Sequence, residues 1–170
     1  MTAVPPEPTA AVTGLEALAA ERERWRQEGR TVVLANGAFD MLHVGHVRYL
    51  AAARALGDVL IVAVNSDRSV RASKGPLRPV VPEAERLELL SHLRMVDRLL
   101  LFDTPTVGPV LERLRPEIHA KGTDYTVETV PEREVVAAYG GRTVICGDPK
   151  DHASTDIIAT IVSRFAPGAP

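Results

Sequence analysis

Continuous apolar runs alternate with amphipathic stretches along most of the chain. A short apolar run bounded by turn residues predicts a buried strand, and apolar side chains that recur every three or four residues predict a helix. By this pattern we expect strands at residues 31–35, 59–64, 98–102, 117–120 and 142–145. We expect helices at residues 13–29, 47–56, 110–114, 131–139 and 154–165, a further helix opening at Pro82, and a polar loop at residues 65–81.

The alternation of strands and helices indicates the fold class. Strands that are separated by helices form a parallel sheet covered on both faces, and each strand is then a nearly continuous apolar run. The sequence therefore predicts an α/β fold, a Rossmann-like doubly wound parallel sheet in a single domain. In such sheets ligands bind beyond the carboxyl ends of the strands. We therefore expect the site at residues 36–46, 65–78, 121–125 and 147–155.

The domain boundaries follow from composition and capping signals. Residues 1–12 are rich in Pro and Ala and are expected to be a disordered leader. Thr13 and Glu16 have the spacing of a capping box, so an N-terminal helix is expected at residues 13–30. The main domain then spans residues 31–165, and a short tail follows at residues 166–170.

Composition and charge narrow the functional classes. The chain has 170 residues and a formal net charge of −2, which argues against a protein that coats nucleic acid, because such binding depends on a broad basic surface. Cys146 is the only cysteine, so neither a disulfide framework nor a cysteine-based metal site is expected within one chain. The sequence shows no signal-peptide pattern and no apolar run of membrane-spanning length. We therefore expect a cytoplasmic protein with no nucleic-acid or membrane partner.

The first predicted strand runs directly into the segment Asn36-Gly37-Ala38-Phe39-Asp40-Met41-Leu42-His43-Val44-Gly45-His46. A strand-to-helix turn directs backbone N–H groups and the positive helix end at one place, which is a ready anion site. His43 and His46 can share a helix face and donate hydrogen bonds to a phosphoryl group as charge builds on it, while Gly45 leaves room for a phosphate. The alternatives are an ordinary polar helix start or half of a zinc site, although zinc usually takes more than two protein ligands.

Later segments contain further candidates. The stretch from Arg68 to Arg78 is basic and contains no acid, which suits a mobile arm over a triphosphate or a solvated surface loop. Ser154-Thr155 opens the last predicted helix, where a hydroxyl group caps the helix, binds a phosphate, or does both. Arg86 and Arg94 accompany a leucine stripe and would face solvent in the simplest interpretation. Asp124 follows a glycine in a turn-like segment.

The segment from Ala35 to His46 resembles the signature of the HxGH-type nucleotidylyltransferase superfamily, the cytidylyltransferase-like enzymes. That superfamily includes glycerol-3-phosphate cytidylyltransferases and heptose 1-phosphate adenylyltransferases. Further matches follow in order within residues 31–162: Val64-Asn65-Ser66-Asp67, Lys74-Gly75, Arg78-Pro79, Glu85-Arg86, Arg94-Met95-Val96-Asp97, Lys121-Gly122-Thr123-Asp124-Tyr125 and Ser154-Thr155-Asp156-Ile157. The greatest likeness is to the D-glycero-β-D-manno-heptose 1-phosphate adenylyltransferases, from whose pattern the chain departs at Ala35, Ala38 and Asp156.

The resemblance implies transfer of the adenylyl group of ATP to a sugar 1-phosphate, with heptose 1-phosphate favoured and with an ADP-sugar and pyrophosphate as products. It implies that residues 31–165 are a nucleotidyltransferase domain and that three residues are catalytic: His43, His46 and Lys74. It implies nucleotide binding by Asn36, Gly37, Phe39, Asp40, Gly45, Lys121, Gly122, Asp124, Ser154 and Thr155. It implies substrate binding by Asn65, Asp67, Arg78, Arg86 and Arg94. Mg²⁺ would enter with ATP, and no dedicated protein cage for the metal is expected.

The resemblance also implies partners and leaves alternatives open. It implies a homodimer or a larger assembly, and a separate sugar kinase upstream, because the sequence contains no fused kinase. The same chemistry would serve a glycerol-3-phosphate cytidylyltransferase or an FAD synthase. A nucleotide-binding regulator without turnover and a zinc hydrolase that uses His43 and His46 are alternatives of other classes.

Overall fold

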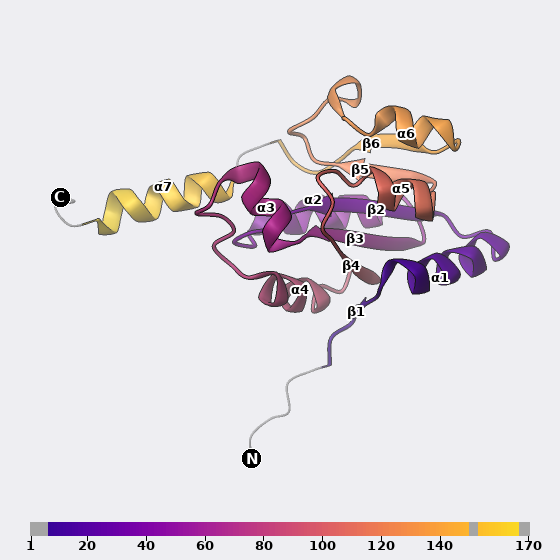
Figure 1. The fold of residues 1–170 in the computed structure, drawn as a ribbon, viewed down its shortest axis with the longest axis horizontal. Helices are drawn as coiled ribbons and strands as arrows, with labels where there is room; N and C mark the ends of the chain where they lie inside the picture. Colours follow the sequence, from indigo (N-terminus) through magenta and orange to yellow (C-terminus); the bar gives the residue numbers. More distant parts are fainter. Residues whose placement is uncertain (1–6, 150–152, 167–170) are drawn as a thin grey trace, which may run out of the picture.

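The computed structural model describes residues 7–149 and 153–166. These residues contain one sheet of six parallel strands in the order β1-β4-β3-β2-β5-β6 (Figure 1). The strands are β1 (Ala11–Val12), β2 (Val32–Gly37), β3 (Val59–Asn65), β4 (Arg98–Phe102), β5 (Ile118–Lys121) and β6 (Arg142–Ile145). The prediction of a Rossmann-like α/β fold is confirmed.

Helices cover both faces of the sheet (Figure 1). On one face α1, α5 and α6 pack on a core cluster that contains Leu18, Leu111 and Val136. On the other face α2 and α4 pack on a second cluster that contains Leu50 and Leu90. The helices are α1 (Leu15–Gln27), α2 (Val44–Arg54), α3 (Asp67–Lys74), α4 (Glu83–Ser91), α5 (Gly108–Leu114), α6 (Arg133–Ala138) and α7 (Ser154–Phe165), with a short 3₁₀ helix η1 (Val127–Thr129).

The two central strands, β2 and β3, lead from the core to the site. Both are buried along most of their length, because each has a neighbouring strand on both sides and helices on both faces. Burial decreases only at their carboxyl ends, where Asn36, Gly37 and Asn65 are partly exposed. The paired register brings these ends to the same edge of the sheet, since Gly37 lies opposite Val64. The topology therefore opens one edge to a ligand, as expected for this fold.

Helix α3 lies within the range that the pattern predicted to be a polar loop. Ser66 is its N-cap, and the Ser66 side chain accepts a hydrogen bond of 3.0 Å from the Ser69 backbone N–H. The helix buries Ser69 and Val70 and has no apolar stripe of its own. Hydrophobic periodicity therefore could not reveal it. Its local signals were the capping Ser66, the acidic Asp67 in the first turn and Gly75 at the C-cap.

The N-terminal segment also differs from the prediction. β1 falls inside residues 1–12, where disorder was expected, and its Ala11 lies opposite Arg98 of β4. Helix α1 begins after Gly14, and no side chain caps it, so the predicted capping box does not form. Residues 1–6 lie outside the described part of the chain.

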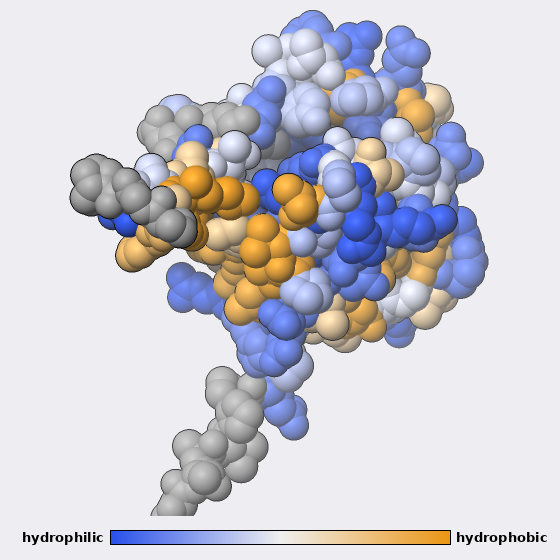
Figure 2. Space-filling model, turned by 60° about the vertical axis from the view of Figure 1, so that its left-hand side comes forward, coloured by the Kyte–Doolittle hydropathy of each residue, from blue (hydrophilic) through white to orange (hydrophobic). Residues whose placement is uncertain are grey.

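Helix α7 projects from the body of the molecule (Figure 1), and none of its residues is buried. Its first residue, Ser154, is tied to the body because its Oγ donates a hydrogen bond of 2.5 Å to the Asp40 carbonyl oxygen. Figure 2 shows apolar surface gathered on the side from which α7 projects, and Val162 and Phe165 are among its exposed apolar side chains. In the described ranges, no helix combines the length and the apolar character that crossing a membrane requires.

Candidate active site

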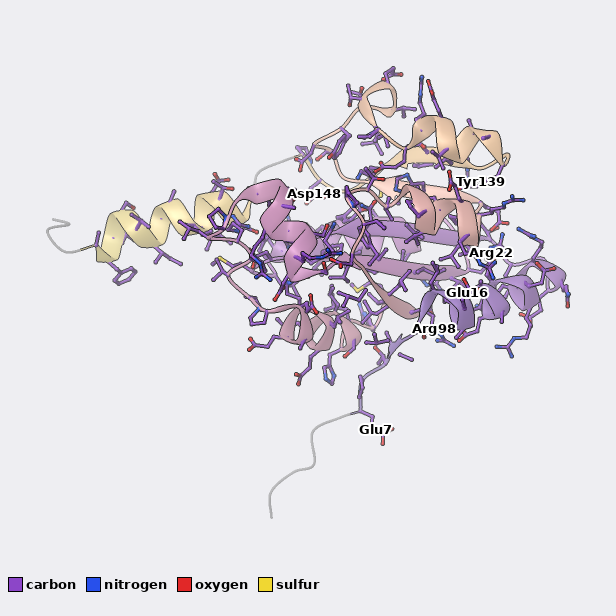
Figure 3. The ribbon with its side chains drawn as sticks, in the orientation of Figure 1. Glu7, Glu16, Arg22, Arg98, Tyr139 and Asp148 are labelled. Atoms are coloured by element: carbon purple, nitrogen blue, oxygen red, sulfur yellow. The ribbon has the colours of Figure 1, made fainter. Side chains whose placement is uncertain are left out.

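A pocket of about 400 Å³ lies at the carboxyl ends of the strands. Figure 3 shows Asp148, one of its lining residues, at this end of the sheet, while Arg22 and Tyr139 lie at the other end. Most of the predicted site residues line it: Asn36, Gly37, Phe39, His43, Gly45, His46, Asn65, Lys74, Arg78, Lys121, Gly122, Asp124, Ser154 and Thr155. Other lining residues were not singled out from the sequence, although most of them lie in the segments where the site was expected: Ala38, Thr123, Tyr125, Gly147, Asp148, Pro149 and Ala153. Two further lining residues, Tyr49 and Cys146, lie outside those segments and were missed.

The two histidines of the first motif form a stacked pair at the start of α2. His43 is the N-cap, His46 lies in the first turn, and their ring centroids are 3.9 Å apart. The His43 backbone N–H donates to His46 Nδ1 at 3.4 Å. Burial, then the nearby His43 and Lys74, lowers the pKa of His46 to about 4. His46 is therefore neutral near pH 7, and because Nδ1 accepts a hydrogen bond, its proton is on Nε2.

The turn that presents this pair is held by Asp40. The flanking residues Phe39 and Met41 have φ values of 50° and 51°, in the left-handed region that non-glycine residues seldom adopt. The Asp40 carboxylate accepts hydrogen bonds from Arg78 Nε at 2.7 Å, Val80 N at 3.0 Å and Val81 N at 2.9 Å. Asp40 is buried and does not line the pocket. The nucleotide contact expected for Asp40 is thus replaced by a structural role, because its carboxylate fixes the loop before α4.

The protonation of Asp40 follows from these contacts. Burial by itself would raise the pKa of the carboxyl group. The hydrogen bonds from Val81, Val80 and Arg78 outweigh burial and hold the pKa below its ordinary value. Asp40 is therefore an anion near neutral pH, paired with Arg78, whose side chain lines the pocket.

Arg86 corrects a further expectation. The sequence suggested a solvent-facing or substrate-binding arginine, whereas the side chain is fully buried. Its guanidinium donates to the carbonyl oxygens of Ala38, Asn65 and Val81 and to the Asp67 carboxylate. Arg86 thus joins the ends of β2 and β3 to the loop before α4, and neither Arg86 nor Asp67 lines the pocket.

Arg94 is not brought to the pocket either. It lies in the turn between α4 and β4, it is exposed, and it is absent from the pocket lining. The leucine stripe suggested that this residue belonged to the preceding helix, but α4 ends at Ser91. Of the five residues expected to bind the acceptor substrate, Asn65 and Arg78 line the pocket.

The opposite wall is formed by the end of β5. Lys121 is buried, its Nζ lies 3.5 Å from Asn36 Oδ1, and it sits 4.5 Å from the centre of the Tyr125 ring. Burial lowers the pKa of Lys121. His119, which the sequence analysis left unassigned, is fully buried behind this wall with its Nε2 3.0 Å from Asn36 Oδ1. A histidine inside a buried strand was the signal that could have found it.

The histidines and acids do not form a metal-binding cluster in the described ranges. No group of three or more His, Cys, Asp or Glu side chains is placed there so that it could hold a metal ion. Two carboxylates, Asp124 and Asp148, nevertheless line the pocket, and Asp148 is paired with Arg48 at 2.7 Å. His152 lies outside the described residues.

Comparison with known families decides the class. The model of the cytidylyltransferase-like family matches residues 34–165, which is most of the chain and contains all the lining segments above. The chain belongs to the cytidylyltransferase-like family. The general reaction of this family is nucleotidyl transfer, and the chain is a nucleotidyltransferase.

Curated relatives contain a region similar to this cytidylyltransferase-like domain as part of a longer protein. The bifunctional protein HldE of Syntrophotalea carbinolica is 46% identical over 143 residues, which are 84% of this chain and 29% of the relative. The bifunctional protein HldE of Geotalea uraniireducens is 44% identical over 156 residues, which are 92% of this chain and 32% of the relative. The chain thus spans about a third of the length of these relatives.

Two solved structures resemble the cytidylyltransferase-like fold of this chain. The lipopolysaccharide core biosynthesis protein of Thermoplasma volcanium has a TM-score of 0.61 and 31% identity, with 72% of this chain and 100% of that chain covered. The pantoate–β-alanine ligase of Francisella tularensis has a TM-score of 0.59 and 14% identity, with 91% of this chain and 77% of that chain covered. The second likeness shows the fold alone.

The buried imidazoles predict that this cytidylyltransferase-like domain loses stability in mild acid. Burial lowers the pKa of His46 to about 4 and of His119 to about 3, from an ordinary value of 6.5. The unfolded chain therefore takes up protons below pH 6.5 that the folded chain does not, so stability is complete above that pH and falls as the pH drops toward 4. A fully shifted histidine contributes at most about 1.4 kcal/mol per pH unit in this window.

Urea unfolding at about pH 7.5 and about pH 5 measures this dependence. The urea midpoint of the wild type should be lower at the acidic pH than at the higher pH. The decrease should be smaller in His119→Leu, which removes one buried imidazole. An equal fall in both proteins would show that His119 titrates normally in the folded state.

Proposed function

We propose that the chain transfers the adenylyl group of ATP to a sugar 1-phosphate, with heptose 1-phosphate favoured, and gives an ADP-sugar and pyrophosphate. The observation that carries the proposal is the placement of His43 and His46 at the N-terminus of α2, in the wall of a pocket that also contains Lys74 and Ser154. A helix N-terminus with imidazole donors suits a phosphoryl group that gains charge in a transition state.

The choice of acceptor has separate support. The likeness to a lipopolysaccharide core biosynthesis protein at 31% identity favours a sugar acceptor. The similarity to proteins named HldE agrees with the resemblance of the motifs to heptose 1-phosphate adenylyltransferases. Asn65 and Arg78 line the pocket from β3 and from the loop before α4, and an amide and a guanidinium are suitable partners for hydroxyl and phosphate oxygens.

The reaction is an in-line displacement at the α-phosphorus. An oxygen of the sugar phosphate forms the new P–O bond, the bond between the α-phosphorus and the bridging oxygen breaks, and pyrophosphate leaves with that electron pair. The attacking phosphate is already an anion at neutral pH, so no general base is required. His46 donates its Nε2–H to an α-phosphate oxygen as charge grows there, and His43 acts beside it.

The leaving pyrophosphate is held by the other side of the pocket. Lys74 ends α3 and Ser154 begins α7, and both line the pocket. The ammonium group neutralises charge on the leaving group, and the helix N-terminus adds backbone donors. The bond from Ser154 Oγ to the Asp40 carbonyl fixes this helix end relative to the histidine turn.

The pocket fits a magnesium ion that arrives with ATP. Mg²⁺ usually keeps several waters and binds through one or two carboxylates together with phosphate oxygens. Asp124 and Asp148 are the pocket-lining carboxylates that could contact it. When bound, the ion supplies neutralisation of the triphosphate charge, and the residues above bind and orient the phosphates.

Pyrophosphate release from a matrix of substrates tests the proposal. The nucleotides are ATP, CTP, GTP and UTP, and the acceptors are D-glycero-β-D-manno-heptose 1-phosphate, glycerol 3-phosphate and FMN, each with Mg²⁺. We expect release with ATP and heptose 1-phosphate alone. Release with another pair would replace the substrate assignment and keep the reaction, whereas nucleotide binding without release from any pair would favour a regulator and contradict the proposal.

Lys74 provides a test of the leaving-group site. Lys74→Met removes the ammonium group from the pocket and is expected to lower kcat by about 10²-fold, because charge on the departing pyrophosphate is no longer neutralised. Arg71→Met is the matched control, since Arg71 is an exposed cation on the same helix and does not line the pocket. Equal losses in both variants, measured by pyrophosphate release, would indicate a general charge effect and contradict the role of Lys74.

A further inference from the structure

Strand β5 contains a buried histidine, His119, that the packing of the core does not require. His119 stands between Ile118 and Ala120 in a strand that is buried throughout. Its side chain is fully buried and does not line the pocket. An apolar residue would fill this position without any polar atom to satisfy, so a polar ring here calls for a specific partner.

That partner is the side-chain amide of Asn36. His119 Nε2 lies 3.0 Å from Asn36 Oδ1, across the junction between β5 and β2. Lys121 Nζ approaches the same oxygen at 3.5 Å. An ammonium group can only donate, so the atom that faces it must be the amide oxygen and not the amide nitrogen. This arrangement fixes which way the amide group is turned.

The ring itself has one proton to give. Burial, then the nearby Lys121, lowers the pKa of His119 to about 3, so the imidazole is neutral. Because its Nε2 faces an acceptor, the proton is on Nε2. His119 Nδ1 is buried and has no hydrogen-bond partner among the described residues. Of the two ring nitrogens, Nε2 thus has a partner among the described residues and Nδ1 has none.

We propose that His119 is a positioning residue, which donates its Nε2–H to Asn36 Oδ1 and thereby holds the Asn36 NH₂ group ready to donate to an acceptor oxygen of the bound substrate. Asn36 lines the pocket at the carboxyl end of β2, and His119 lies behind it. The acceptor is a phosphate or hydroxyl oxygen, either of the nucleotide or of the sugar phosphate. This inference rests on the proposed function for the identity of the substrates, but not for the hydrogen bond itself.

The hydrogen bond is tested without turnover by two-bond ¹H–¹⁵N NMR of the imidazole nitrogens in the wild-type chain. We expect a neutral ring protonated on Nε2, with no titration between about pH 8 and about pH 5. A ring protonated on Nδ1, or a charged ring near neutral pH, would overturn the inference. Because no substrate is present, this result does not depend on the reaction that the chain catalyses.

The positioning role is tested by kinetics of four variants, of which three carry one substitution and one carries two. His119→Leu should lower kcat/KM by between about 10-fold and 100-fold, and His119→Gln should recover part of the loss, because its amide can still donate to Asn36. His119→Leu combined with Asn36→Ala should be no worse than Asn36→Ala alone, since both remove the same contact. The urea midpoint of His119→Leu near pH 7.5 should not fall.

The remaining outcomes separate this inference from the proposed function. Wild-type kinetics in His119→Leu, or additive losses in the double variant, would overturn the positioning role. If the wild type turns over no substrate pair, the proposed function fails, and titration of ATP and of heptose 1-phosphate with the same variants decides the inference by binding. Whichever of the two binds more weakly to His119→Leu carries the acceptor oxygen, and unchanged binding of both would overturn the inference.

Discussion

Replacing His46 with alanine is expected to lower kcat by between about 10²-fold and 10³-fold, which is the usual loss when one preorganised donor to a developing charge is removed. His46 is neutral, and its Nδ1 already accepts from the His43 backbone, so its Nε2–H is the group directed to a ligand. The loss should appear in kcat more than in KM, because the hydrogen bond strengthens as charge builds on the phosphoryl group.

The measurement for His46→Ala is pyrophosphate release together with thermal unfolding. His92→Ala is a matched control, because His92 is an exposed histidine at the end of α4 and does not line the pocket. The control should retain its activity, and both variants should remain folded. Near-normal turnover in a folded His46→Ala protein would exclude the proposed role of the histidine pair.

Replacing Arg86 with methionine is expected to destabilise the protein by about 3–5 kcal/mol, the range found when one partner of a buried ion pair is removed. The guanidinium is fully buried and bonds three backbone carbonyls in addition to Asp67. Methionine has a similar length but no donor, so these acceptors would remain buried without partners. Activity should fall as a consequence, because two of these carbonyls belong to Ala38 and Asn65, which line the pocket.

Urea unfolding of Arg86→Met beside Arg94→Met distinguishes a structural role from a substrate contact. Arg94 is exposed in the turn after α4, so its replacement should change stability by no more than about 0.5 kcal/mol. If Arg86→Met were as stable as the wild type and showed only a raised KM for the sugar phosphate, Arg86 would be a substrate ligand after all.

The central strands were predictable because a strand that is buried on both faces is a nearly continuous apolar run in the sequence. β3 and β4 follow the predicted ranges closely, since each is an apolar run that ends at a turn. β6 also matches its predicted range, although it is an edge strand without a buried residue. β1 has two residues and exists only through pairing with β4, so no local pattern could indicate it. Helix α3 depends on a serine cap and one buried valine, and its charged sequence appears as a loop to any periodicity argument.

The site residues that belong to one continuous motif were predictable from the sequence. Those whose role depends on tertiary contacts were not. His43, Gly45 and His46 reach the pocket because the motif itself forms the turn after β2. Arg86 and Asp40 lie in segments that equally indicate ligand binding. Their charged groups instead form hydrogen bonds with residues that are distant in the sequence. No local sequence pattern indicates which distant residues will come into contact. The contact between His119 and Asn36 was therefore not predictable either.

The most direct test of the central claim is the fate of labelled phosphorus in ATP incubated with the protein, Mg²⁺ and heptose 1-phosphate. With ATP labelled at the α-phosphorus, adenylyl transfer predicts that the label enters the ADP-sugar, and with ATP labelled at the γ-phosphorus it predicts that the label appears only in pyrophosphate. A γ-label in the sugar product, or an α-label recovered in ADP or in AMP alone, would contradict adenylyl transfer and show that the pocket directs a different reaction.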